Sequence, residues 1–450
     1  MKRVRLLLVI VILSVVLGAC GTTPEPQAST QAIEVEKEVE QVAVPDCAIE
    51  PPAKPVEFTY LGWPMPVMAP YTTALDKCNA VKNIKVYVRE MDNASAIEQM
   101  SLAFGSGGAS PFAIVMQSNS SIQQNVWKGW LMPLDDLVEK YWEKYQLDDI
   151  APVHWEAATF DGTIYGIPMT ANVIMLMYRS DLFKKYNLKV PTTYDEIISA
   201  CGVLKQEPGL TVPFAMDLSA GWAWSIAFYE ALASLGGNVF VEGTFEPAFN
   251  SPEGVAALTK IKEVADACMG VEGMALGSNG MGAGMGNGTI GFIHTWASEG
   301  AALIDPEKSD MWDKIAFAPA ASVEAGGKLA GSSWNDFWAI PASFEGDADL
   351  VFQLIMEAAR ADHQAEAAKA GLVPRTSALL SSENPLATAA LETLEKGVGP
   401  VPKSIAYPIL DAALGNYLPF VGSGELTPKE ALQKAEEQYI SEATDKGYLK

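Results

Sequence analysis

Residues 173–200 read VIMLMYRSDLFKKYNLKVPTTYDEIISA, and this stretch contains both kinds of element from which the fold is built. The mainly apolar run Val173–Arg179 predicts a buried strand. After Pro191, the sequence Thr193-Tyr194-Asp195-Glu196 is a capping box, which predicts the start of a helix. A strand that leads into a capped helix is the basic unit of an α/β fold.

The same alternation continues on both sides of this stretch. Further strands are predicted at Val56–Tyr60, Ile84–Arg89, Phe112–Gln117, Thr211–Met216, Thr289–Trp296, Ile315–Pro319 and Phe337–Pro341. Ser251-Pro252-Glu253 and Thr427-Pro428-Lys429-Glu430 predict helix starts, because proline suits the first helical turn. Short strands that alternate with helices predict an α/β fold with layers around largely parallel sheets.

One glycine-dominated segment, residues 277–288, departs from this alternation. Its spacing matches neither of the common phosphate-binding glycine loops. Its methionines, together with His294, loosely suggest copper. We expect a flexible surface loop and no metal site here.

Length and composition limit the possible functions. A chain of 450 residues is too long for one core, so two domains are expected. The composition is 49% hydrophobic and 19% charged, as in globular proteins. The net charge of −24 repels nucleic acid and anionic lipid head groups, so we expect no nucleic-acid partner.

The N-terminus has the features of an export signal. Lys2, Arg3 and Arg5 precede the apolar run from Leu6 to Leu17, which is too short to span a bilayer. Leu17-Gly18-Ala19-Cys20 resembles a bacterial lipobox. We therefore expect residues 1–19 to be a lipoprotein signal and Cys20 to carry a lipid, which would anchor the chain outside the cytoplasm. Such a chain would be periplasmic if the host has an outer membrane. An ordinary export signal is the alternative.

Residues 20–55 are predicted to be a flexible tether, because they are rich in proline and charge and contain no aromatic residue. The chain contains four other cysteines, at positions 47, 78, 201 and 268, which allow three disulfide pairings. We favour Cys47–Cys78 and Cys201–Cys268, since each pair closes a loop within one half of the chain. Free buried thiols are the alternative.

Most catalytic patterns are missing from the sequence. No serine has glycine two residues before and two residues after it, and the three histidines form no zinc-binding motif. We therefore predict no catalytic residue, no metal and no cofactor. A secreted glycan-acting enzyme stays as an alternative, because a glycosidase needs only two carboxylates that meet in space.

Tryptophan is abundant, with 11 residues, and several lie beside polar side chains. Examples are Gly62-Trp63, Trp222-Ala223-Trp224, His294-Thr295-Trp296 and Trp334-Asn335-Asp336. An indole ring covers the apolar face of a sugar, while Asp, Asn and Gln bond its hydroxyls. The pattern favours sugar binding; the alternative for any one tryptophan is a place in the core.

Seven motifs, in this order, give the chain a family resemblance. They are Leu102–Pro111, Gly129–Asp136, Asp161–Pro168, Met177–Phe183, Pro191–Glu196, Leu235–Gly237 and Ala370–Arg375. Together they resemble the extracellular solute-binding protein family 1, the maltose-binding-protein-like carbohydrate receptors of ABC importers. Phe112 stands where the family has Asp, and the glycine-rich segment stands where relatives have a short helix.

The resemblance implies two α/β lobes joined by a hinge of chain crossings, with the ligand in the cleft between them. Lobe 1 would contain residues 56–168 and 321–375, and lobe 2 residues 171–314 and 378–450. Crossings are expected near residues 168–173, 315–320 and 375–380. Closure around a ligand requires contacts to both lobes.

The resemblance also implies a set of ligand-binding residues, with Trp296 as the main stacking platform. The others are Trp63, Gln117, Ser118, Asn119, Asp217, Trp222, Trp334, Asn335, Asp336, Tyr407 and Tyr417. The implied function is capture of a sugar or oligosaccharide by a monomeric lipoprotein and its delivery to the ABC permease. The alternative is the same fold with a polyamine, a phosphorylated polyol or another small solute as ligand.

Overall fold

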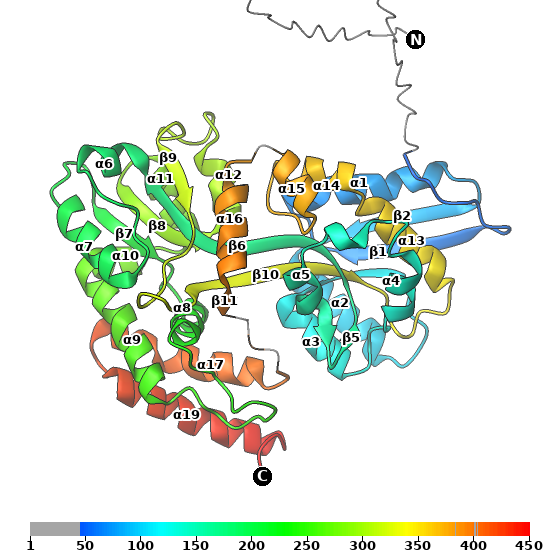
Figure 1. Ribbon diagram of the computed structural model, residues 1–450. Coiled ribbons are helices and arrows are strands. Elements are labelled where there is room, and N and C mark those ends of the chain that lie inside the picture. Colours follow the sequence, from blue (N-terminus) through cyan, green and yellow to red (C-terminus); the bar gives the residue numbers. More distant parts are fainter. Residues whose placement is uncertain (1–45, 383, 400–401, 403) are drawn as a thin grey trace, which may run out of the picture. The chain divides into compact units, whose positions relative to one another are not determined.

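The computed structural model describes residues 46–382, 384–399, 402 and 404–450 (Figure 1). The predicted signal (1–19), Cys20 and the tether up to residue 45 lie outside the described residues. The strands are β1 (Val56–Gly62), β2 (Ile84–Glu90), β3 (Ile114–Ser118), β4 (Thr159–Phe160), β5 (Thr163–Ile164), β6 (Ile167–Arg179), β7 (Val212–Met216), β8 (Ile290–Trp296), β9 (Ile315–Ala318), β10 (Leu329–Ala339) and β11 (Val398–Gly399).

The helices cover the faces of these strands. They are α1 (Ala69–Lys77), α2 (Asn93–Gly105), α3 (Asn119–Trp127), α4 (Asp135–Tyr141), α5 (Pro152–Ala158), α6 (Ser180–Lys185), α7 (Tyr194–Leu204), α8 (Gly221–Ser234), α9 (Pro252–Val264), α10 (Gly270–Met274), α11 (Ser278–Gly286), α12 (Gly300–Leu303), α13 (Ala348–Ala358), α14 (Ala361–Ala367), α15 (Thr376–Ser381), α16 (Leu386–Lys396), α17 (Tyr407–Tyr417), α18 (Pro419–Ser423) and α19 (Pro428–Asp445). Short 3₁₀ or π turns lie at Pro66–Met68, Cys78–Ala80, Leu147–Asp149, Ala265–Met269 and Ala297–Glu299.

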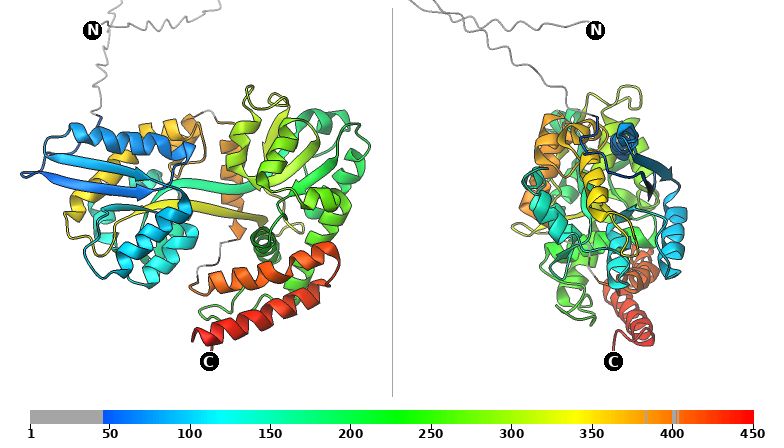
Figure 2. Two further views of the ribbon diagram at one scale, coloured as in Figure 1. Left: turned by 180° about the vertical axis from the view of Figure 1, so that it is seen from behind. Right: turned by 90° about the vertical axis from the view of Figure 1, so that its right-hand side faces the viewer.

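The strands form two lobes that share two long strands. The order across the sheet is β2-β1-β3-β10-β6-β8-β7, and β9 pairs with β6. Lobe 1 is built around β1, β2 and β3, and lobe 2 around β7, β8 and β9; β6 and β10 run through both (Figures 1 and 2). The outer strands β1–β2, β1–β3 and β7–β8 pair in parallel, whereas β10 is antiparallel to β3 and β6. The predicted two-lobed α/β fold is confirmed.

The two shared strands are longer than the sequence predicted. β6 begins at Ile167 rather than Val173, and β10 begins at Leu329 rather than Phe337. The prediction depended on aliphatic runs, and the residues where these strands pass between the lobes include Thr170, Asn172 and Trp334 instead. In the sequence, a strand that continues from one core to the other is therefore recognisable only over its aliphatic part and is predicted too short.

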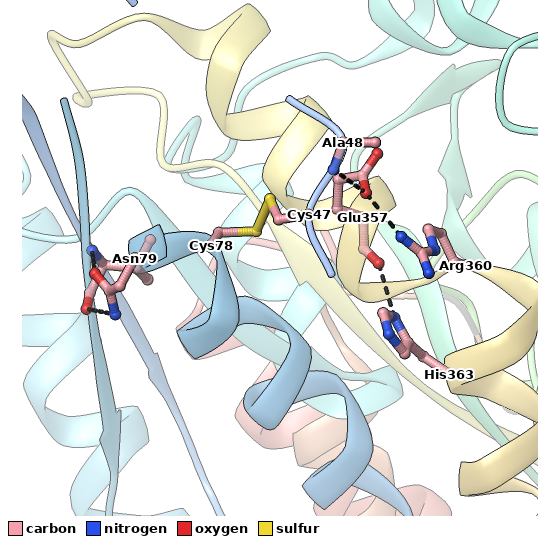
Figure 3. The surroundings of a disulfide bond; sticks show 8 residues. Cys47, Ala48, Cys78, Asn79, Glu357, Arg360 and His363 are labelled. Atoms are coloured by element: carbon pink, nitrogen blue, oxygen red, sulfur yellow. Dashed lines mark hydrogen bonds and ion pairs between the residues drawn. A yellow bond between two sulfur atoms is a disulfide. The ribbon is translucent and has the colours of Figure 1, made fainter. Parts of the chain in front are cut away.

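Residues 46–55 are attached to lobe 1, although their composition resembles a tether. Cys47 forms a disulfide with Cys78 at the end of α1 (Figure 3). The backbone N–H of Ala48 donates to Glu357 Oε2 of α13 (2.9 Å), and Arg360 donates to the same oxygen (3.3 Å). The second disulfide, Cys201–Cys268, joins α7 to the π turn after α9. Both are the pairs favoured from the sequence.

The expectation of a surface loop at residues 277–288 was wrong, because Ser278–Gly286 forms helix α11. Met281 and Met285 of this helix are buried. A Cβ atom at Gly284 would lie 2.5 Å from Ile290 Cδ1, so glycine lets α11 pack closely against β8. Within the described residues no cluster of three His, Cys, Asp or Glu side chains forms a metal site. No helix in the same part of the chain has both the length and the apolar character needed to cross a bilayer.

Candidate functional site

Two tryptophans meet where the shared strands pass between the lobes. Trp334 of β10 lies opposite Asn172 of β6, and Trp296 of β8 lies opposite Ile174 of β6. Paired residues of antiparallel strands share a face, and so do residues two apart on one strand, so all four side chains lie on the same face. The centroids of the two indole rings are 6.4 Å apart, edge to face, and both rings are partly exposed.

The same face continues into lobe 1. Asp336 lies opposite both Thr170 of β6 and Ser118 of β3. Thr170 Oγ1 donates to Asp336 Oδ2 (2.9 Å). Burial raises the pKa of the Asp336 carboxyl to about 6, and hydrogen bonds from Thr170 and Trp334 limit the rise.

The lobe 2 wall of this face contains a small cavity of about 20 Å³. It lies where the parallel strands β7 and β8 end, the edge at which sheets of this kind bind ligands. Its lining residues are Ile174, Met216, Asp217, Trp222, Ala223, Ile226, Ala227, Glu230, His294, Thr295 and Trp296. Trp222, in the first turn of α8, is 49% exposed. The structure thus places Asp217, Trp222 and Trp296 around one cavity.

Asp217 organises the loops at this edge. Its Oδ1 accepts from the backbone N (3.1 Å) and Oγ (2.8 Å) of Ser219. Its Oδ2 accepts from the backbone N (3.2 Å) and Oγ (3.1 Å) of Ser278 at the start of α11. Four hydrogen bonds occupy the carboxylate, so Asp217 holds the rim of the cavity in place.

Two titratable residues of this cavity were missed from the sequence. His294 is 3% exposed, and its Nε2 has no hydrogen-bond partner among the described residues. Burial lowers the pKa of its ring to about 4. Glu230 of α8 is 1% exposed, accepts from Ser332 Oγ (2.7 Å), and has its pKa raised to about 8 by burial. Both groups are therefore mainly uncharged at neutral pH.

The sequence contains a signal for only one of these residues. His294 is two residues before Trp296 on a predicted strand, so the two side chains had to share a face. Glu230 lies in the apolar helix α8, and nothing in its neighbours indicates that it faces β10.

Several predicted site residues of lobe 1 bond to the protein itself. Gln117 is fully buried and its Oε1 accepts from Asn125 (2.7 Å). Asn335 is also fully buried, with its Oδ1 2.6 Å from His154 Nδ1. Asn119 donates to the backbone O of Ser333 (3.3 Å) and accepts from the backbone N of Asn335 (3.1 Å). These side chains hold α3, α5 and β10 together.

The remaining aromatic candidates lie at different distances from the cavity. Trp63 is buried just after β1. Helix α17 runs antiparallel to α8, with Gly415 against Gly221 and the Tyr407 ring 5.9 Å from the Tyr229 ring. Tyr417 therefore lies at the end of α17 that meets the start of α8, and Tyr407 lies at the far end.

Two larger cavities lie elsewhere between the lobes. One, of about 790 Å³, is lined by Trp127 of α3, residues 159–161, the loop 237–245 and residues of 402–405. The other, of about 420 Å³, is lined by Asn119, Ser333 and residues of α5 and α16. Ser333 alternates with Trp334, so the second cavity lies on the opposite face of β10. Both are large enough for a small-molecule ligand.

Comparisons with known proteins agree with this arrangement. The profile of a family described as bacterial extracellular solute-binding protein matches residues 73–393. An uncharacterized ABC transporter extracellular-binding protein of Pyrococcus horikoshii is 32% identical over 111 residues, 24% of this chain and 25% of that protein. A mannitol-binding protein of Pseudomonas aeruginosa is 27% identical over 229 residues, 48% of this chain and 49% of that protein. The chain thus matches at most about half the length of these relatives.

A solved structure has the same fold over nearly its whole length. It is a solute-binding protein of an ABC transporter from Agrobacterium radiobacter, in complex with ribitol. The TM-score is 0.72 at 22% identity, and the match covers 86% of this chain and 99% of that chain. A likeness at this identity establishes the shared fold.

Proposed function

The chain belongs to the bacterial extracellular solute-binding proteins, and from this premise we propose that it captures an uncharged polyhydroxy solute, a sugar or a sugar alcohol, for an ABC importer. The family works outside the cytoplasm. The related proteins described above bind mannitol and ribitol, which belong to this chemical class.

The observation that carries the proposal is the contact between Trp296 and Trp334 on the face that joins the two lobes. Two partly exposed indole rings offer apolar surface for the C–H face of a polyol. No Lys or Arg is among the described residues that line the adjoining cavity, and its Glu230 and His294 are mainly uncharged near neutral pH. A phosphorylated ligand would need Arg or Lys side chains or a free helix N-terminus, and the absence of Arg and Lys from this lining favours a neutral ligand.

Closure of the two lobes on the solute is part of the proposal. We assign the crossings to residues 171–173 of β6, residues 333–335 of β10 and the segment after Arg375, which donates to the backbone of Tyr145 and Gln146 in lobe 1. Residues 320–332 go with lobe 2, since Val323 N donates to Ser234 Oγ (2.8 Å). The second crossing in this proposal is thus about 16 residues later than the family resemblance implied.

The chain's membrane attachment and its partner complete the proposed role. Cys20 would hold the receptor at the membrane, and the closed, loaded form would dock on the permease. The solute would leave chemically unchanged, so we propose a receptor and not an enzyme.

A thermal-shift screen with product analysis tests the proposal. Ribitol, D-mannitol and maltose represent the proposed class; a polyamine and a phosphorylated polyol represent the alternatives. We expect a rise in melting temperature with at least one member of the first group and no chemical change in it. Stabilisation by the polyamine or the phosphorylated polyol alone, or turnover of a glycan, would overturn the proposal.

A further inference from the structure

The small cavity beside Trp296 has the size of a single chemical group. Its volume of about 20 Å³ exceeds the roughly 10–15 Å³ that one water-sized group needs, and is far below that of a sugar ring. Trp222 and Trp296 stand at its edge, and His294 and Glu230 lie deeper. A solute that stacks on the tryptophans can therefore place one substituent in this cavity.

His294 lines this cavity, and its Nε2 has no hydrogen-bond partner in the part of the chain that the structure describes. The ring is hydrogen-bonded to the backbone of Ala330, and this bond favours the protonated ring, as a bond to a carbonyl oxygen does. That nitrogen then carries the hydrogen of the neutral ring, which leaves Nε2 as an acceptor. A buried acceptor without a partner is costly, so a residue that contains one and also lines a cavity indicates the place of a ligand group.

Glu230 supplies the complementary hydrogen-bonding group. Its Oε1 accepts from Ser332 Oγ of β10 (2.7 Å). Enclosed in lobe 2 with no cation paired to it in the described part of the chain, the carboxyl keeps its proton near neutral pH and can donate from its other oxygen. The cavity thus offers one acceptor and one donor, and a hydroxyl group is both a donor and an acceptor. A carboxylate offers no donor for His294 Nε2.

Building on the proposed function, we propose that this cavity is a subsite for one hydroxyl group of the solute, which donates to His294 Nε2 and accepts from Glu230. The subsite selects an alcohol over a carboxylate at that position of the ligand. His294 and Glu230 are thereby specificity-determining residues, in addition to the tryptophans that stack on the ligand.

Isothermal titration of the purified protein with D-mannitol, ribitol and maltose tests this subsite. We expect His294→Phe to weaken the tightest of the three at least about tenfold, the effect of removing one buried hydrogen-bond partner. His154→Phe is the matched control, because His154 is equally buried but its Nδ1 is paired with Asn335. It should leave the affinity unchanged. If D-mannitol binds, a second ligand tests which hydroxyl enters the cavity. 1,6-Dideoxy-D-mannitol lacks both terminal hydroxyls. If a terminal hydroxyl of D-mannitol occupies the cavity, the wild type and His294→Phe should bind this analogue with equal affinity.

A second measurement needs no variant. The chain has three histidines, so ¹⁵N NMR of the labelled wild type resolves them readily. Saturation with the ligand should shift the Nε2 signal of His294 and leave that of His154 in place. Equal affinity of the wild type and His294→Phe, or an unmoved His294 signal in the saturated wild type, would overturn the subsite while the proposed function stands. Failure of the wild type to bind any of the three probes would instead overturn the proposed function.

Discussion

Both lobes bury a histidine and a carboxyl group, yet they pair them differently. In lobe 1, His154 Nδ1 lies 2.6 Å from Asn335 Oδ1, and Asp336 is bonded to Thr170. In lobe 2, His294 lines a cavity beside Trp296, and its Nε2 has no hydrogen-bond partner among the described residues. Burial lowers the pKa of both histidines to about 4.

The difference separates structural from ligand-binding polar groups. The pKa values of the two histidines shift in the same direction for the same reason, so these shifts do not distinguish the sites. The two sites are distinguished by their hydrogen-bond partners and by whether the histidine lines a cavity. In lobe 1 several buried polar side chains bond to one another and to the backbone, while four buried polar atoms have no partner among the described residues: Tyr71 Oη, Tyr145 Oη, Asn335 Nδ2 and Trp338 Nε1. In lobe 2, His294, whose Nε2 has no partner among the described residues, lines the cavity where the solute is proposed to bind.

The largest expected effect concerns the two buried carboxyls. In the folded protein the Glu230 carboxyl keeps its proton up to about pH 8. In the unfolded chain the same carboxyl loses its proton above about pH 4.5. The folded state then binds more protons, so stability falls as pH rises through this window. Relative to Glu230→Gln, the wild type should lose about 4 kcal/mol of unfolding free energy between pH 5 and 8, at about 1.4 kcal/mol per pH unit.

Asp336→Asn is the matched variant in lobe 1. The pKa of Asp336 rises only from 3.8 to about 6, so the pH range over which its ionisation lowers stability ends near pH 6. Urea denaturation of the three proteins from pH 4 to 9 should show a difference that grows up to pH 8 for Glu230→Gln and up to pH 6 for Asp336→Asn. Parallel curves for the wild type and Glu230→Gln between pH 6 and 8 would mean that Glu230 is ionised in the folded protein.

The second prediction distinguishes the tryptophan face from the larger cavities. Trp296→Ala should weaken solute binding roughly 100-fold, about 3 kcal/mol, as loss of a central aromatic contact does. Trp127→Ala is the control: Trp127 is 61% exposed and lines the 790 Å³ cavity. It should bind as the wild type does in a titration. The reverse result would move the binding site to the larger cavity.

The third prediction concerns stability in lobe 1. His154→Phe should lower the free energy of unfolding by about 1–3 kcal/mol, because it leaves Asn335 Oδ1 buried without its partner. His294→Phe removes an unpaired buried group, so in the ligand-free protein it should cost less. Urea denaturation without ligand compares the two. A larger loss for His294→Phe would show that the unpaired ring of lobe 2 is itself structural.

The sequence was a good guide wherever one element served one core. The run Val56–Tyr60 alternates apolar and polar residues, and the run Thr211–Met216 is mainly apolar. Strand β1 contains the first run, and β7 covers the second except for Thr211. It failed at the ends of β6 and β10 that pass between the lobes, because polar and aromatic residues there interrupt the aliphatic pattern. The glycine-rich α11 was missed for a related reason: glycine is a poor helix former, and only the close packing against Ile290 explains it.

The candidate site was predictable only in part. Trp296 and Trp334 were predicted as ligand-binding residues because polar residues flank them in the sequence, and strand pairing brings the two rings together. Strand alternation could have added His294. Glu230 could not have been found, because its role depends on the packing of α8 against Ser332, which no local pattern encodes. Gln117 and Asn335 are of residue types that often bind ligands, so the sequence made them candidates. Both are fully buried, and this burial depends on the tertiary fold, which the local sequence does not show.

The smallest expected effect concerns a link between the lobes. Gln123 of α3, in lobe 1, donates from Nε2 to the backbone O of Pro402 (3.1 Å) and accepts at Oε1 from the backbone N of Ser404 (2.6 Å). These two residues lead into α17, which packs on α8 of lobe 2. Gln123→Ala should lower the free energy of unfolding by only about 1–2 kcal/mol, the net value of two such bonds.

Hydrogen exchange gives the sharper readout for this link. The amide of Ser404 should exchange faster in Gln123→Ala, while amides in the middle of α3 keep their protection, because only the contact between the lobes is lost. Gln124→Ala is the control: it changes the same residue type on the same helix, at a side chain with no hydrogen bond in the described residues. Unchanged exchange at Ser404 would mean that α17 is held by α8 and α19 alone.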